Sequence, residues 1–298
     1  MSTALAITRH LGLDVVELTA PDGARATIAL HGAHVMSWLP AGAGEQLYLS
    51  PRSGFATGQA IRGGVPVCFP QFSDRGPLPK HGFARTRPWQ LVSAEQGEHD
   101  ALAVLRLSDD AATRLLWPHA FEAELSVRVA GQTLELELAC ENRGEAPFEF
   151  TTALHSYLRV GDIDDASVQG LVGLNYWDSA ASQEKQQRVD LLLPSGEVDR
   201  IYFDLPGELL LQDGDRRLSV RHQGFADAVV WNPGAEKCAQ LPDMPADGFR
   251  QMLCVEAAAI GRPVRLSPGE AWAGLQSLTL VAAQEHAPPE SRPAAPQE

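Results

Sequence analysis

Apolar and polar residues alternate along much of the chain, most regularly near its middle. Every second residue over 121–129 is apolar, and charged or polar residues stand between them. After Gly131 and Gln132 the same alternation returns over 134–138. Because successive side chains of a strand point to opposite faces of a sheet, the two runs predict an antiparallel hairpin with one buried face.

Further strand patterns follow along the chain. A second hairpin is predicted over 208–212 and 217–221, with its turn at Asp213-Gly214. One short helix is predicted over 108–116, where two aspartates open the segment. Shorter runs typical of strands lie at 25–30, 102–107, 228–231 and 275–281. Many short strands, punctuated by 26 glycines and 21 prolines, indicate an all-β sandwich or barrel.

The chain has 298 residues, and no change of composition separates two domains. Large all-β folds often reach this length as one unit, so we expect a single domain over residues 1–283. Residues 284–298 are rich in Pro, Ala and Glu and are predicted to form a disordered tail.

The overall charge limits the possible partners. The chain carries 24 Lys and Arg against 38 Asp and Glu, a formal net charge of −14. A negative field of this size repels phosphodiester backbones and anionic membranes, so neither nucleic acid nor a membrane is expected as a partner.

Compartment signals are also absent from the sequence. No apolar run is long enough to span a bilayer, and the first 20 residues lack the hydrophobic stretch of a signal peptide. The four cysteines lie far apart with no C-x-x-C pair, which argues against a secreted disulfide framework and against a thiolate zinc site. We therefore expect a cytoplasmic protein.

The most unusual segment covers residues 52–88. It holds six basic residues and one acid, Asp74, so its local charge is +5 within an acidic chain. Glycine and proline are frequent there, which stiffens a loop and lets its backbone approach a ligand closely. Such a cationic segment fits a small anionic ligand, and arginine suits phosphate oxygens in particular. A solubilising surface loop with scattered ion pairs fits the charge equally well.

Two histidines and one glutamate are candidates for proton transfer. His81 lies within the cationic segment, and His155 lies in a run of small and β-branched residues that is typical of a strand. Histidine exchanges protons most readily near neutral pH, although a single histidine on a strand is more often structural. Glu256 follows a wholly apolar run, where a carboxylate is costly to bury unless it is paired or used. A glutamate at a strand end that reaches water is the commoner case.

Other chemistries find little support in the sequence. His31 and His34 are three residues apart, so in a strand they would face opposite sides and would not share a metal ion. No helical H-E-x-x-H pattern occurs, and the G-x-S-x-G, Rossmann and P-loop patterns are absent as well. Catalysis by a metal ion, a nucleotide cofactor or a serine nucleophile is therefore not expected.

Seven short segments stand out as a set because of their order along the chain. They are LYLS at 47–50, AIRGGVPVCFP at 60–70, LPKHGFAR at 78–85, LLWPH at 115–119, LHSY at 154–157, VVWNP at 229–233 and CVE at 254–256. In this order they resemble the glucose-6-phosphate 1-epimerases, or hexose-6-phosphate mutarotases, which are relatives of the aldose 1-epimerases. The likeness extends over residues 32–276, nearly the whole expected domain.

The resemblance implies a galactose-mutarotase-like β-supersandwich of antiparallel sheets with few short helices. His155 corresponds to the family's catalytic histidine, and Glu256 corresponds to its catalytic glutamate. The substrate-binding positions of the family fall on Arg62, Lys80, His81, Arg85 and Asp199. Lys80 departs from the glutamine that some members carry at this position.

The activity that the resemblance implies is the interconversion of the α and β anomers of a hexose 6-phosphate, without a cofactor. Glu256 would take the proton of the C1 hydroxyl and His155 would protonate the ring oxygen, with His81 steadying the substrate or sharing the acid role. Two alternatives stay open. One is an aldose 1-epimerase that acts on free sugars, and the other is a non-catalytic carbohydrate-binding protein on the same fold. The sequence does not indicate the oligomeric state.

Overall fold

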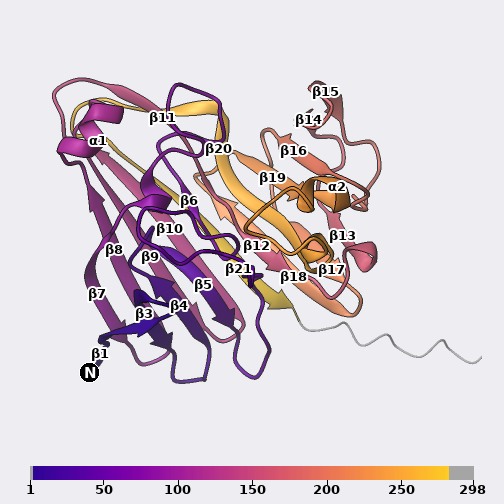
Figure 1. Ribbon diagram of the computed structural model, residues 1–298, viewed down its shortest axis with the longest axis horizontal. Helices are drawn as coiled ribbons and strands as arrows, with labels where there is room; N and C mark the ends of the chain where they lie inside the picture. Colours follow the sequence, from indigo (N-terminus) through magenta and orange to yellow (C-terminus); the bar gives the residue numbers. More distant parts are fainter. Residues whose placement is uncertain (1–2, 282–298) are drawn as a thin grey trace, which may run out of the picture.

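Antiparallel sheets make up most of the molecule (Figure 1). The computed structural model describes residues 3–281, so the tail expected over 284–298 lies outside the described residues. Within that range the α-helices are α1 (Ala111–Leu116) and α2 (Gly234–Cys238), and single 3₁₀ turns lie at Ala84–Thr86, Ile163–Asp165 and Gly248–Gln251. The expected all-β class, with few short helices, is confirmed.

The largest sheet has nine strands. Its strands, in spatial order, are β1 (Thr3–Ala4), β7 (Gln90–Gln96), β8 (Ala101–Ser108), β9 (Phe121–Ala130), β10 (Thr133–Asn142), β21 (Ala271–Val281), β18 (Arg216–Gln223), β17 (Leu209–Asp213) and β13 (Ala166–Gln169). The predicted strands near residues 102–107 and 275–281 are β8 and β21.

Two further sheets complete the fold. The strands of the eight-stranded sheet are β15 (Gln183–Gln186), β14 (Asn175–Asp178), β16 (Val198–Tyr202), β19 (Asp227–Asn232), β20 (Met252–Leu266), β11 (Phe148–Leu154) and β6 (Val67–Cys68), with β12 (Tyr157–Arg159) paired to β20. The four-stranded sheet consists of β2 (Ile7–His10), β3 (Leu13–Thr19), β4 (Arg25–Ala29) and β5 (His34–Leu39).

Both predicted hairpins form, one of them with a shifted turn. Ala130 of β9 pairs with Thr133 of β10, so Gly131 and Gln132 make the first turn as predicted. In the second hairpin Asp213 pairs with Arg216, so the turn is Gly214-Asp215 and not Asp213-Gly214. Gly214, with φ 58°, occupies the first central position, as glycine does in type II′ turns.

The predicted helix also forms, but it is shorter than expected. Ser108 still belongs to β8, and α1 begins only at Ala111. Asp110 caps the helix because its carboxylate accepts a hydrogen bond of 2.7 Å from the Thr113 backbone N–H. The cap therefore sets the first residue of the helix, and the preceding alternation belongs to the strand.

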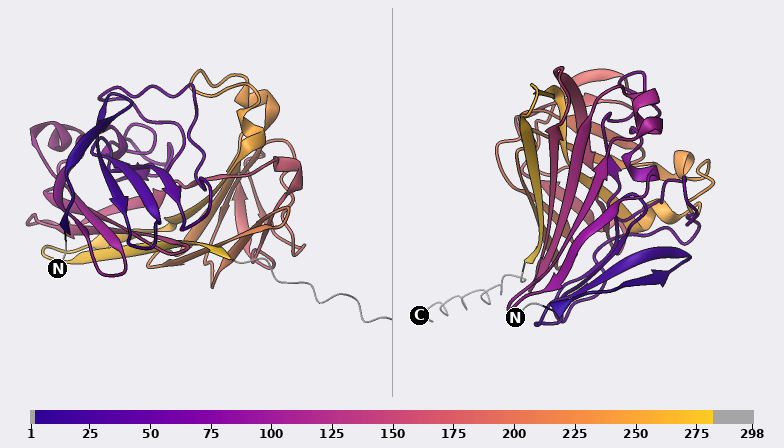
Figure 2. Two further views of the ribbon diagram at one scale, coloured as in Figure 1. Left: turned by 90° about the horizontal axis from the view of Figure 1, so that it is seen from below. Right: turned by 90° about the vertical axis from the view of Figure 1, so that its left-hand side faces the viewer.

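One continuous core of buried side chains joins the three sheets. Strand β3 packs beside β7 and β8, and Figure 2 shows the four-stranded sheet, in indigo, against the long strands of the nine-stranded sheet. Alternate side chains of strand β20 point to the two faces of the eight-stranded sheet. Leu253, Val255 and Ala257 point into this core. Cys254 and Glu256 point to the opposite face of the eight-stranded sheet, where a second apolar cluster lies. Among residues 3–281 no helix is long and apolar enough to cross a bilayer.

Candidate active site

The floor of the candidate site is the face of the eight-stranded sheet that points away from the large core, the face of Cys254 and Glu256. Two rows of directly paired residues cross this face from strand to strand. Residues that pair directly in antiparallel strands project from the same face, so register alone places the members of a row side by side. The first row is Trp177, Ile201, Val229 and Glu256. The second row is Asp199, Trp231, Cys254 and Tyr157.

Segments 61–87 and 233–251 fold over this floor and enclose a pocket of about 450 Å³. All seven residues predicted for the site line it: Arg62, Lys80, His81, Arg85, His155, Asp199 and Glu256. The sequence thus led to one pocket from five separate segments. Their roles stay predictions, because position alone does not establish what each residue does.

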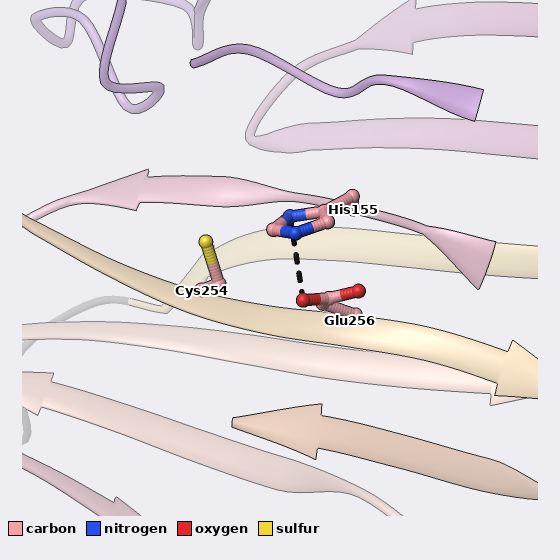
Figure 3. Close-up of side chains that lie close together, drawn as sticks. All are labelled: His155, Cys254 and Glu256. Carbon is pink, nitrogen blue, oxygen red and sulfur yellow. Dashed lines mark ion pairs between the residues drawn. The ribbon is translucent and has the colours of Figure 1, made fainter. Parts of the chain in front are cut away.

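The centre of the pocket is a buried carboxylate beside a buried imidazole. Nδ1 of His155 lies 3.3 Å from Oε1 of Glu256 (Figure 3), and the two side chains are 9% and 1% exposed. Neither carboxylate oxygen of Glu256 receives a hydrogen bond from any residue in 3–281. Burial, followed by the charge of Asp199, raises the pKa of Glu256 well above its usual value. Such a carboxylate accepts a proton more readily than an exposed glutamate does.

In the pocket without a ligand, both histidines favour the neutral form. Burial, with a contribution from His81 and then from the guanidinium groups of Arg85 and Arg62, lowers the pKa of His155 well below its usual value. Burial also lowers the pKa of His81 to about 3, with smaller contributions from Arg85 and Lys80. The two rings meet edge to face with their centroids 5.4 Å apart. Neutral imidazoles in this setting can donate or accept hydrogen bonds without carrying a charge.

Positive charge gathers on the segment 61–87 side of the pocket. Arg62 is anchored: its Nε and Nη2 lie 3.2 and 3.1 Å from Oδ2 of Asp243, and its Nη1 donates to the Tyr157 hydroxyl at 2.9 Å. Arg85 donates to the backbone carbonyl of Lys80 at 2.9 Å. The Lys80 ammonium pairs with no carboxylate among the residues that the structure describes. An anion in the pocket would therefore meet cationic groups that are not yet neutralised.

The pocket also contains residues that the sequence analysis did not assign to it, among them Tyr157, Trp231, Trp177, Arg75 and Lys237. Tyr157 and Trp231 lie within two of the motifs that define the family resemblance, at 154–157 and 229–233, so they could have been predicted from those motifs. The guanidinium of Arg75 lies 5.8 Å from the centre of the Trp177 ring, a cation–π contact between the cationic segment and β14. Arg75 was one of the six basic residues of that segment, whereas nothing in the sequence singled out Trp177.

Cys254 adds a third side chain of a type that binds metals. The potential ligand atoms of His155, Cys254 and Glu256 all lie within 4.8 Å of one another (Figure 3). A thiolate, an imidazole and a carboxylate together are typical Zn²⁺ ligands. Arg62 acts electrostatically on His155 and Cys254, however, and Arg85 acts on His155, so a metal cation there would be repelled by both guanidinium groups. The arrangement is therefore better suited to proton transfer on an anionic ligand.

The expectation for His31 and His34 needs a correction. The two residues do not share a strand, because Gly32 and Ala33 form a turn before His34 opens β5. His34 is completely buried, and burial lowers its pKa to about 3. Neither histidine belongs to a group of three potential metal ligands within residues 3–281. His34 lies behind the loop that carries Arg62, since a Cβ atom on Gly64 would stand 2.6 Å from Nε2 of His34.

Solved structures first define the class of this fold. The chain superposes on the crystal structure of a provisionally named mutarotase from Salmonella typhimurium with a TM-score of 0.86, 32% identity and 94% coverage of both chains. A galactose mutarotase related enzyme from Lactobacillus acidophilus matches with a TM-score of 0.70 over 91% of this chain and 99% of that one, at 16% identity. The fold is the galactose-mutarotase-like β-sandwich, as the resemblance implied.

Sequence comparisons then define the family. A protein from Escherichia coli K12 that is provisionally named glucose-6-phosphate 1-epimerase is 39% identical over 251 residues, which cover 83% of each chain. A protein of the same provisional name from Cenchrus ciliaris is 35% identical over 282 residues, 91% of this chain and 85% of that one. The family model described as aldose 1-epimerase matches residues 14–279. The chain belongs to the aldose 1-epimerase family.

Proposed function

We propose that the protein is a hexose-6-phosphate mutarotase, which interconverts the α and β anomers of glucose 6-phosphate or a closely related sugar phosphate. The observation that carries the proposal is the combination, in one pocket, of the buried Glu256–His155 pair with the cationic side chains of segment 61–87. The pair supplies proton transfer, and the cations supply a reason to prefer an anionic sugar. The names of the relatives from Escherichia coli and Cenchrus ciliaris point to the same substrate.

The reaction needs a base that reaches the C1 hydroxyl and an acid that reaches the neighbouring ring oxygen. Glu256, as the carboxylate, takes the proton of the C1 hydroxyl while His155, as the imidazolium, donates a proton to the ring oxygen, and the C1–ring oxygen bond breaks to give the open-chain aldehyde. Burial disfavours the imidazolium in the pocket without ligand, and the negative charge of the bound 6-phosphate favours it. Rotation about the C1–C2 bond exposes the other face of the carbonyl. The ring oxygen then adds to that face, each proton returns, and both residues regain their starting states. His81 steadies the ring or shares the acid role.

The tuned ionisation of Glu256 suits it to the base role. A general base works best when its pKa lies near the operating pH, and burial moves the carboxyl group in that direction. The reaction neither oxidises nor reduces the sugar, so proton transfers between these side chains are sufficient and no cofactor is proposed.

The 6-phosphate is assigned to the cationic side of the pocket. Arginine presents two parallel N–H donors that match phosphate oxygens, and Lys80 and Arg85 are candidates for this contact beside Arg62. Asp199 lies across the floor, and burial raises its pKa, so it is suited to a hydrogen bond with a sugar hydroxyl. We place the protein in the cytoplasm, where hexose phosphates are found.

Anomer exchange measured by NMR tests this function. The wild type should exchange the anomers of glucose 6-phosphate much faster than those of free glucose, because only the phosphate uses the cationic side of the pocket. Glu256→Gln should lower the exchange rate by about 10²–10⁴-fold, the usual contribution of a general base. Glu95→Gln, an exposed glutamate on β7, is the matched control and should leave the rate unchanged.

The other outcomes favour the two alternatives. Equal exchange of glucose and glucose 6-phosphate would identify an aldose 1-epimerase that acts on free sugars. Sugar binding without exchange above the uncatalysed rate would identify a carbohydrate-binding protein on the same fold. Exchange in Glu256→Gln at the wild-type rate would remove Glu256 from the mechanism.

A further inference from the structure

Cys68 contacts one of the pocket histidines from behind. Its Sγ lies 3.1 Å from Nδ1 of His81, and the backbone N–H of Ser73 donates to the same nitrogen at 3.3 Å. A nitrogen that accepts an N–H bond cannot itself carry a proton. The proton of neutral His81 is therefore on Nε2, and the Cys68 S–H is a second donor to Nδ1.

The surroundings keep both partners in these protonation states. Cys68 is completely buried on β6, and burial raises the pKa of its thiol, so the sulfur retains its proton. His81 stays neutral because burial and the charges of Arg85, Lys80 and Arg62 all lower its pKa. Because Nδ1 already accepts the Ser73 N–H, the hydrogen bond between the protonated sulfur and the neutral ring runs from sulfur to nitrogen.

The backbone holds the ring in place over the pocket. His81 has φ 65°, and its own N–H donates to the Ser73 carbonyl at 2.8 Å, so the loop closes on itself around the imidazole. The His81 ring makes edge-to-face contacts with Phe72 and His155, with ring centroids 5.1 and 5.4 Å apart. Within residues 3–281 nothing hydrogen-bonds Nε2, and His81 lines the pocket. Nε2 is thus free to meet a ligand.

We propose that Cys68 is a positioning residue whose thiol, together with the Ser73 N–H, holds His81 as the tautomer that presents an Nε2–H donor to the sugar. This inference rests on the proposed function, in which His81 contacts the substrate. A donor is the useful form there, since negative charge develops on the ring oxygen as the C1 bond breaks. With the other tautomer, Nε2 would turn a lone pair toward that oxygen.

The tautomer itself is measured without reference to activity. In the full chain labelled with ¹⁵N-histidine, long-range ¹H–¹⁵N spectra distinguish a protonated ring nitrogen from an unprotonated one, and His81→Gln assigns the signals. Wild-type His81 should show a protonated Nε2 and an unprotonated Nδ1 throughout pH 6–8. A protonated Nδ1, or an imidazolium in this range, would overturn the proposal.

Kinetics then test Cys68. Cys68→Ala removes one donor, and kcat for the sugar phosphate should fall about two- to tenfold, the equivalent of one net hydrogen bond, with KM within twofold. Cys68→Ser returns an O–H donor and should recover most of the loss. Cys140→Ala, a buried cysteine on β10 away from the pocket, should lower the melting temperature comparably but leave kcat unchanged.

The outcomes separate this inference from the proposed function. If Cys68→Ala and Cys68→Ser both retain the wild-type kcat, Cys68 has no positioning role. If the wild type exchanges no sugar at all, the proposed function fails, and the spectrum of His81 alone decides whether the tautomer is held as described.

Discussion

Glu256 is the residue whose ionisation should govern the pH dependence of the reaction. Because burial raises its pKa above the usual glutamate value, kcat should rise with pH along a limb whose midpoint lies above 4.5. On the alkaline side kcat should fall as the His155 imidazolium of the complex loses its proton, whereas His81, with a pKa of about 3, should add no limb near pH 6.5. Exchange rates at saturating substrate between pH 4.5 and 9 measure this profile.

The second ionisation of the substrate phosphate, at about pH 6, has to be separated from that limb. The ³¹P shift recorded in the same samples follows the phosphate directly. A kcat that is constant from pH 5 to 8 would mean that Glu256 ionises as an ordinary exposed glutamate, and the base role would then need another residue.

At the level of single residues, the sequence predicted those that stand in local motifs. All seven candidates line the pocket, and six of them stand in the short segments that are recognisable together by their order along the chain. Asp199 stands outside those segments and was carried over from the family resemblance. Trp177 was not predicted, because it reaches the pocket through strand pairing that no local pattern shows. It pairs with Ile201 of β16, and β16 itself lies two strands from the strand of Glu256. Cys68 stood in a motif, but its contact with His81 depends on how the loop that carries His81 packs against β6.

Among the elements, the loop that carries Arg62 depends on Gly64, where any side chain is strained. Gly64 has φ 58°, and a Cβ atom there would overlap the carbonyl oxygen of Val35 and crowd His34. Gly64→Ala should cost about 1–2 kcal/mol for the left-handed backbone, with about 1–3 kcal/mol more for the overlap. The displaced loop should also raise KM for the sugar phosphate. Denaturant unfolding and exchange kinetics measure the two effects.

Gly58→Ala is the matched control for this change. Gly58 lies in the same segment with φ 83°, but nothing stands within 4 Å of its missing Cβ atom. It should show only the cost of the left-handed backbone and an unchanged KM. Equal effects of the two substitutions would mean that the contact with β5 does not position Arg62.

The elements that the sequence predicted best are those with one buried face. The β9–β10 hairpin follows its alternation residue by residue. Strand β20 gave no such pattern, because its first nine residues, Met252 to Ile260, are buried on both faces and read as an apolar run. Glu256 is the one charged residue within that buried run. The burial that removes the alternating pattern of the strand also raises the pKa of the Glu256 carboxyl group.

For the molecule as a whole, alternation along the chain could not predict which strands pair. Strand β10 lies beside β21, more than a hundred residues later, and β11 lies beside β20. Such contacts depend on the packing of complete sheets against one core, which no local pattern encodes. The β-sandwich was predicted through the resemblance of ordered motifs, and the comparisons confirmed it.

The whole molecule should lose stability in mild acid, because it buries several histidines in the neutral form. The pKa is lowered to about 3 for His34 and His81 and to about 4 for His222, and it is lowered for His155 as well. Between pH 6.5 and 4.5 the unfolded chain binds protons that the folded chain excludes, so the free energy of unfolding falls as pH falls, by about 1.4 kcal/mol per pH unit for each proton. Glu256 and Asp199, whose folded pKa values are raised, act in the opposite direction but supply at most two protons against four from the histidines. Urea unfolding at pH 7.5, 6.5, 5.5 and 4.5 measures the net slope, and His34→Gln should reduce that slope by up to one proton. A free energy of unfolding that stays constant down to pH 4.5 would show that these histidines titrate alike in the folded and unfolded chains.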